Sequence, residues 1–97
     1  MARVALVTGG TRGIGKAITQ GLVQAGYKVA ANYAGNDKAA EAVAAELGVK
    51  VYKWDIGDWE SCQAGIRRVE ADLGPIDVLV NNAGITRDGF FHKMNVD

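Results

Sequence analysis

The sequence has little of what marks several classes of protein. Its 97 residues include a single cysteine, Cys62, which excludes an intrachain disulfide framework and a cysteine-based metal site. The first apolar stretch, residues 4–7, is too short for a signal-peptide core or a membrane span. Eleven basic residues balance eleven acidic ones, so nothing steers the chain toward nucleic acid or an anionic membrane. We therefore expect a cytoplasmic protein without a metal.

What remains is a globular composition. Hydrophobic residues make up 48% of the sequence, and 97 residues lie within the size range of one folded unit. No internal repeat or low-complexity linker divides the chain. We expect residues 1–97 to belong to one domain.

Short apolar segments alternate with stretches of helical character. The apolar segments are rich in β-branched residues and run without alternation, which is typical of parallel strands buried on both faces; they are residues 4–7, 29–31, 49–52 and 76–80. The helical stretches are residues 13–25, 37–47 and 58–73. The expected apolar stripe of the first helix consists of Ile14, Ala17, Ile18, Leu22 and Ala25.

The ends of these helices carry recognisable signals. Asn36 or Asp37 is a candidate N-cap for the second helix, and Asp58 for the third. Gly26 and Gly48 are natural stops for the first two helices, and residues 74–75, Gly-Pro, end the third.

This alternation predicts an α/β fold with a doubly wound, Rossmann-type parallel sheet. Short connections between strand, helix and strand favour right-handed crossovers and the strand order 3-2-1-4. The chain then reverses direction between the first and fourth strands, and ligands of open α/β sheets bind at such a reversal. The loops after Val7 and Val80 should face each other across a cleft.

A glycine-rich segment joins the first strand to the first helix. Residues 8–15 read Thr-Gly-Gly-Thr-Arg-Gly-Ile-Gly. Free N–H groups at a helix N-terminus stabilise a pyrophosphate, and glycine lets the backbone approach it. We expect Gly9 to permit the turn, Gly13 the close approach, and Gly15 the packing of helix against sheet. Its place between a strand and a helix favours phosphate binding over a turn that binds nothing.

Two motifs together resemble the classical short-chain dehydrogenase/reductase family. The spacing Thr-Gly-x-x-x-Gly-x-Gly is followed about 70 residues later by Asn-Asn-Ala-Gly at residues 81–84, and the resemblance covers the whole chain. It implies a nicotinamide dinucleotide bound by Gly9, Thr11, Arg12, Gly13, Ile14, Gly15, Asn32, Tyr33, Asp55, Ile56, Asn82, Ala83 and Gly84. Asp55 would meet the adenine edge, although a turn aspartate is the simpler interpretation. Asn81 is expected to tie strands together.

The end of the second strand bears on which dinucleotide binds. A carboxylate there accepts hydrogen bonds from the NAD ribose and repels a 2′-phosphate, but residues 32–36, Asn-Tyr-Ala-Gly-Asn, hold none before Asp37. In the family, members that prefer NADP resemble this chain in placing a basic residue before Gly13, here Arg12. NADP is therefore favoured, with Lys38 a weaker candidate for the same phosphate and a solvated surface charge the alternative for Arg12.

The C-terminal stretch points to a substrate class. Residues 82–88 resemble a loop of reductases that act on 3-oxoacyl thioesters. Residues 51–55, 73–80 and 91–94 are most similar to the reductases that convert acetoacetyl-CoA to 3-hydroxybutyryl-CoA with NADPH in polyhydroxybutyrate synthesis. The alternative substrate is a 3-oxoacyl-[acyl-carrier-protein], and carrier, chain length and stereochemistry stay open. Asp88 either borders the substrate entrance or is an exposed loop aspartate.

The resemblance places the catalytic residues beyond this sequence. In the family a serine and a Tyr-x-x-x-Lys helix act on the ketone, and Tyr27, Tyr33 and Tyr52 each lack a lysine four residues on. We expect no catalytic residue in residues 1–97, an inactive chain by itself, and a homotetramer for the full-length enzyme. An alternative of another class is a non-catalytic NADP-binding or assembly module. An unpaired edge at residues 76–80 would make the isolated chain dimerise, swap strands or aggregate.

Overall fold

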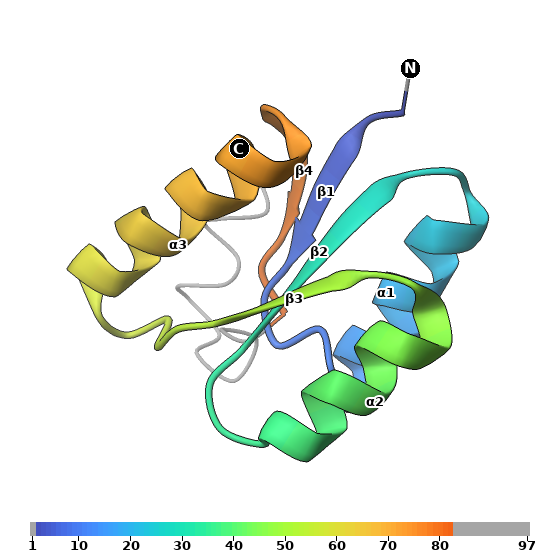
Figure 1. The fold of residues 1–97 in the computed structure, drawn as a ribbon, viewed down its shortest axis with the longest axis horizontal. Coiled ribbons are helices and arrows are strands. Elements are labelled where there is room, and N and C mark those ends of the chain that lie inside the picture. The colour runs from blue at the N-terminus through green and yellow to red at the C-terminus, as the bar shows by residue number, and fades with distance from the viewer. Residues whose placement is uncertain (1, 83–97) are drawn as a thin grey trace.

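Residues 2–82 fold into one parallel sheet with helices between successive strands (Figure 1). The computed structural model describes residues 2–82. The elements are β1 (Val4–Val7), α1 (Gly13–Gln24), β2 (Lys28–Tyr33), α2 (Asp37–Leu47), β3 (Lys50–Lys53), α3 (Trp59–Leu73) and β4 (Ile76–Val80). The sheet order is β3-β2-β1-β4. The predicted fold class and strand order are confirmed.

The register of the sheet brings the carboxyl ends of its strands together. Val7, the last residue of β1, pairs with Ala31 of β2 and with Val80 of β4. Tyr33, which ends β2, pairs with Lys53, which ends β3. The loops that follow β1, β2, β3 and β4 therefore leave the same edge of the sheet.

Helices cover both faces of the sheet, which gives three layers (Figure 1). On one face α3 packs through Val69, which is fully buried, against a cluster that contains Leu6 and Trp54. On the other face α1 and α2 pack on a cluster that contains Val7 and Val43. An ion pair between Lys16 of α1 and Glu46 of α2, 3.2 Å, links these two helices.

The buried face of α1 differs from the predicted stripe. Gly15 and Thr19 are its buried residues, and the Thr19 hydroxyl donates to the carbonyl oxygens of Gly10 (3.0 Å) and Gly15 (2.9 Å). Because α1 approaches the sheet through these small residues, the helix is rotated and part of the expected stripe faces outward. The residues wrongly predicted as buried are Ile14, Ala17 and Ala25, with Ile14 66% exposed.

The prediction that all four strands are buried on both faces holds for two of them. Every residue of β1 is buried, and so is most of β2. In β3 the first and last residues are exposed, and in β4 exposed residues alternate with less exposed ones; Leu79 of β4 is 45% exposed. These two strands are less buried because they form the two edges of the described sheet.

The helix ends follow most of the sequence signals. The side chain of Asn36 accepts a hydrogen bond from the Ala39 amide at 3.0 Å, and Gly48 ends α2 in a left-handed conformation. Asp58 occupies the N-cap position of α3 without a capping bond to the backbone. Its carboxylate accepts instead from the Ser61 hydroxyl at 2.6 Å, so the capping bond expected there is not formed.

Within residues 2–82, none of the helices combines the length and apolar character that a membrane span requires.

Candidate functional site

An open cleft of about 980 Å³ lies at the carboxyl edge of the sheet. This volume is within the range of small-molecule and cofactor sites. The predicted site residues that line it are Gly9, Thr11, Arg12, Gly13, Asn32, Tyr33, Asp55, Ile56 and Asn82. Sequence motifs far apart in the chain thus meet at the predicted reversal between β1 and β4.

The remaining predicted site residues are not among those that line the cleft. Gly15 lies beneath the glycine loop, and Ile14 is exposed but does not line the cleft. Ala83, Gly84 and Asp88 lie outside the described residues. The cleft also has lining residues that were not predicted: Ala34, Gly35, Asn36 and Gly57. Their place after β2 and β3, next to predicted residues, was the signal that could have found them.

The glycine loop is shaped by its own backbone conformation and by hydrogen bonds to the strands. Gly9 and Gly13 have positive φ angles of 63° and 54°, which residues with a Cβ rarely adopt. The Gly10 amide donates to the Asn32 carbonyl at 3.0 Å, and the Lys16 amide donates to the Arg12 carbonyl at 3.1 Å. The amides of residues 13–15 precede that bond and so have no carbonyl partner within the helix, at the N-terminus where a helix attracts anions.

Gly15 fixes the distance between α1 and the loop above it. A Cβ at this position would lie 1.9 Å from the Gly9 carbonyl oxygen and 2.6 Å from Nδ2 of Asn82. The same Nδ2 donates to the Gly9 carbonyl at 3.1 Å, so the tip of β4 is tied to the loop. This is the packing role predicted for Gly15. Gly10 has a similar role that the sequence analysis missed, because its Cβ would lie 2.8 Å from Oγ1 of Thr19.

Asn32 positions the loop from below. The residue is 1% exposed; Oδ1 accepts from the Gly9 amide at 3.2 Å, and Nδ2 donates to the Trp54 carbonyl at 3.1 Å. Both ends of the amide are therefore engaged within the protein. Asn32 lines the cleft as a residue that joins β1, β2 and β3, a role that its place in the sequence did not reveal.

Asn81 links the ends of β1 and β4. The Thr8 hydroxyl donates to Oδ1 of Asn81 at 3.1 Å, and the Thr8 amide donates to the Val80 carbonyl at 3.0 Å. The prediction that Asn81 ties strands together is confirmed. Within residues 2–82, its buried Nδ2 has no hydrogen-bond partner.

Asp55 forms the turn that was the simpler interpretation offered for it. Its Oδ1 accepts from the Gly57 amide at 2.9 Å, which makes it a turn aspartate. It also lines the cleft, and it is the one carboxylate among the lining residues of the described chain. Arg12, which also lines the cleft, is exposed, and among residues 2–82 its guanidinium forms no ion pair.

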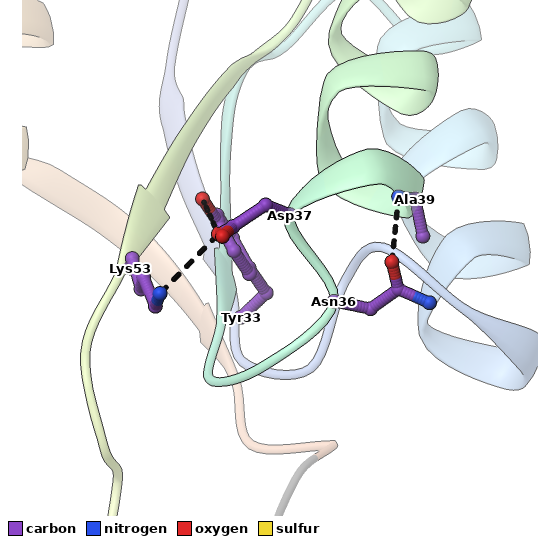
Figure 2. Close-up of polar contacts among 5 residues, drawn as sticks. All are labelled: Tyr33, Asn36, Asp37, Ala39 and Lys53. Atoms are coloured by element: carbon purple, nitrogen blue, oxygen red, sulfur yellow. Dashed lines mark hydrogen bonds and ion pairs between the residues drawn. The ribbon is translucent and has the colours of Figure 1, made fainter.

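The rim of the cleft at the end of β2 carries a small polar cluster (Figure 2). The Tyr33 hydroxyl donates to Oδ1 of Asp37 at 3.0 Å, and Nζ of Lys53 lies 3.3 Å from the same oxygen. Burial, together with the hydrogen bond to Asp37, raises the pKa of the Tyr33 hydroxyl. The hydroxyl therefore stays protonated at neutral pH and keeps donating to Asp37.

Known proteins share both the sequence and the fold. The chain is 68% identical to the acetoacetyl-CoA reductase of Shinella zoogloeoides over all 97 residues, which is 40% of that protein's length. It is 44% identical over 99 aligned residues to the 3-oxoacyl-[acyl-carrier-protein] reductase FabG of Staphylococcus aureus, covering 97% of this chain and 40% of that one. The chain thus spans about two fifths of the curated relatives that it matches.

A solved structure supports the same relationship. The structure of the F189W actinorhodin polyketide ketoreductase with NADPH superposes with a TM-score of 0.78 at 35% identity, over 84% of this chain and 33% of that one. Residues 3–97 match the family described as short chain dehydrogenase. With a family match across nearly the whole sequence, and with the glycine loop and Asn82 lining one cleft, the chain belongs to the short-chain dehydrogenase family.

Proposed function

We propose that residues 1–97 form the nucleotide-binding part of a reductase and that the cleft holds NADP(H). One observation supports this proposal above all: the α1 N-terminus, Arg12 and the connection between β2 and α2 line the same cleft. The amides of residues 13–15 suit a pyrophosphate. The connection at residues 34–36 presents no carboxylate to a 2′-phosphate.

The residues present fit such a cofactor. Gly9 and Gly13 provide backbone without side chains at the loop, and Arg12 provides a positive charge that has no ionic partner among residues 2–82. Asp55 and Ile56, which follow β3, form part of the cleft wall. We propose that this wall receives the adenine ring. The bound cofactor would supply a hydride, and the chain's own residues would bind and orient it.

For the whole protein we propose the NADPH-dependent reduction of acetoacetyl-CoA to 3-hydroxybutyryl-CoA, as in polyhydroxybutyrate synthesis. Support comes from the 68% identity to an acetoacetyl-CoA reductase, compared with 44% to a reductase of acyl-carrier-protein thioesters. The serine, tyrosine and lysine that act on the ketone are proposed to follow residue 97. Proton transfer and carbonyl polarisation by such groups is general acid catalysis with electrostatic support.

A chimeric enzyme tests this proposal. It joins residues 1–97 of this chain to the remaining three fifths of the Shinella zoogloeoides reductase, and the intact Shinella protein is the control. We expect the chimera to oxidise NADPH, followed by absorbance, with a higher kcat/KM for acetoacetyl-CoA than for acetoacetyl-[acyl-carrier-protein]. No turnover of either substrate, under conditions where the control is active, would contradict the proposal and favour a non-catalytic binding module.

A further inference from the structure

Three side chains at the rim of the cleft form a charge-compensated cluster. Tyr33 comes from the end of β2, Asp37 from the first turn of α2, and Lys53 from the end of β3. The hydroxyl of Tyr33 and the ammonium group of Lys53 both contact Oδ1 of Asp37, at 3.0 Å and 3.3 Å. Figure 2 shows the Asp37 side chain directed toward these two residues, while Asn36 turns away to cap α2 at Ala39.

The cluster adjoins the cleft through Tyr33. Tyr33 and residues 34–36 line the cleft, whereas Asp37 and Lys53 do not. Asp37 is the first carboxylate after β2, one residue past the lining segment. An uncompensated negative charge at this place would repel a phosphate bound against residues 33–36. The cluster offsets that charge with one cation and one hydrogen-bond donor.

We propose that Lys53 is a positioning residue for cofactor choice: by pairing with Asp37 against Tyr33, it keeps this carboxylate from repelling the 2′-phosphate of NADP(H). The inference rests on the proposed function, because it assumes that the adenosine end of the cofactor lies along residues 33–36. Lys53 acts through Asp37 and does not contact the phosphate. The site thereby tolerates an aspartate near the position where NAD-binding proteins carry a ribose-binding carboxylate.

The expected size of the change in cofactor preference follows from the solvent exposure of the Lys53–Asp37 ion pair. The side chains of Lys53 and Asp37 are 53% and 57% exposed, and exposed ion pairs contribute only modest free energies. Loss of Lys53 should therefore raise the KM for NADPH by about two- to five-fold relative to that for NADH. Because the charges are in contact with solvent, the change should shrink as the ionic strength rises.

A double-mutant cycle in the chimera tests the inference. The variants are Lys53→Met, Asp37→Asn and the two combined, with Lys53→Arg as the conservative replacement; kcat and KM are measured with both dinucleotides, together with inhibition by 2′,5′-ADP and by 5′-AMP. We expect Lys53→Met to weaken NADPH and 2′,5′-ADP selectively with kcat nearly unchanged. The same change should have no effect in the Asp37→Asn background, and Lys53→Arg should restore the native ratio.

Each other outcome overturns the proposal in a distinct way. An equal loss of NADPH preference from Lys53→Met in both backgrounds would mean that Lys53 meets the phosphate itself. Equal losses for NADPH and NADH, with a lower melting temperature, would mean that the cluster only supports the fold. An unchanged ratio in the native background would refute the role of Lys53 while leaving NADP(H) binding intact. If the unaltered chimera used neither dinucleotide, the proposed function itself would fail.

Discussion

Gly15 lies where the backbone of α1 approaches the backbone of the glycine loop closely. Replacing it with alanine would place Cβ 1.9 Å from the Gly9 carbonyl oxygen, which backbone atoms cannot relieve by a rotamer change. We expect Gly15→Ala to lower the free energy of unfolding by about 3 kcal/mol or more, as in severe overpacking. Urea unfolding of the chimera, followed by circular dichroism, measures this.

Gly21 provides the matched control for that experiment. It lies on the same helix, and a Cβ there would meet nothing within 4 Å. Gly21→Ala should stabilise the protein by about 0.5–1 kcal/mol, because alanine has the higher helix propensity. If both variants unfolded at the same urea concentration, the close approach at Gly15 would be refuted.

A second residue-scale prediction concerns Tyr52. Its hydroxyl donates to Oδ2 of Asp72 at 2.7 Å. Burial, followed by this hydrogen bond, raises the pKa of Tyr52 to about 12. Since the folded pKa exceeds the unfolded value of about 10, the contribution of Tyr52 to stability is complete below pH 10 and is lost as the pH rises toward 12.

Tyr52→Phe tests this dependence on pH. At pH 8 the variant should be less stable by about 1.5–3 kcal/mol, the range for a hydrogen bond to a charged group. The difference from the native protein should narrow between pH 10 and 12, as measured by urea unfolding across that interval. A difference that stayed constant over the whole interval would show that the Tyr52 hydroxyl titrates at its ordinary pKa.

The sequence predicted some site residues and not others, for a physical reason. The glycine loop could be predicted because positive φ angles and helix N-termini depend on residues that are neighbours in the chain. The bonds of Asn32 to Gly9 and Trp54 join three strands. The ion pair between Asp37 and Lys53 likewise depends on the register between β2 and β3. Local sequence patterns do not determine that register.

At the scale of elements, α2 depends on its N-terminal cap. Asn36 is the one helix N-cap of the described chain whose side chain accepts a backbone hydrogen bond, from Ala39. Asn36→Ala should destabilise the protein by about 1 kcal/mol, whereas Asn36→Ser should retain most of the stability because serine also caps. Thermal melts of the two variants measure this, and equal losses for both would contradict a capping role.

The rotation of α1 shows where pattern-based reasoning stops at this scale. Periodicity placed the helix correctly from residue 13 onward, but it assigned Ile14 and Ala17 to the core. Hydrophobicity alone cannot show that a glycine and a threonine face the sheet. Their burial follows from the close approach at Gly15 and from the hydroxyl bonds of Thr19 to Gly10 and Gly15.

For the whole molecule, the edge formed by β4 is an apolar feature that stays exposed in the described chain. Leu79 on β4 is 45% exposed and Trp59 at the start of α3 is 73% exposed; both border a groove of about 500 Å³. Edge strands with apolar faces favour association. We expect the isolated 97-residue chain to self-associate, with a solution mass above that of a monomer in analytical ultracentrifugation.

Leu79→Lys should shift that association toward the monomer, because a charge on an edge strand opposes pairing. Ala17→Lys, on the exposed side of α1, is the matched control and should leave the mass unchanged. A native chain that melted cooperatively as a monomer would refute the expectation.

The central claim is that the N-terminus of α1 holds a dinucleotide opposite the tip of β4. An NMR titration of the chimera with NADPH, carried out with the 97 residues of this chain isotope-labelled, tests it most directly. We predict saturable amide shifts concentrated at residues 9–15, 33–36 and 82, stronger at equal concentration than those with NADH. Shifts confined to the groove between α3 and β4, or no shifts with either dinucleotide, would contradict the account.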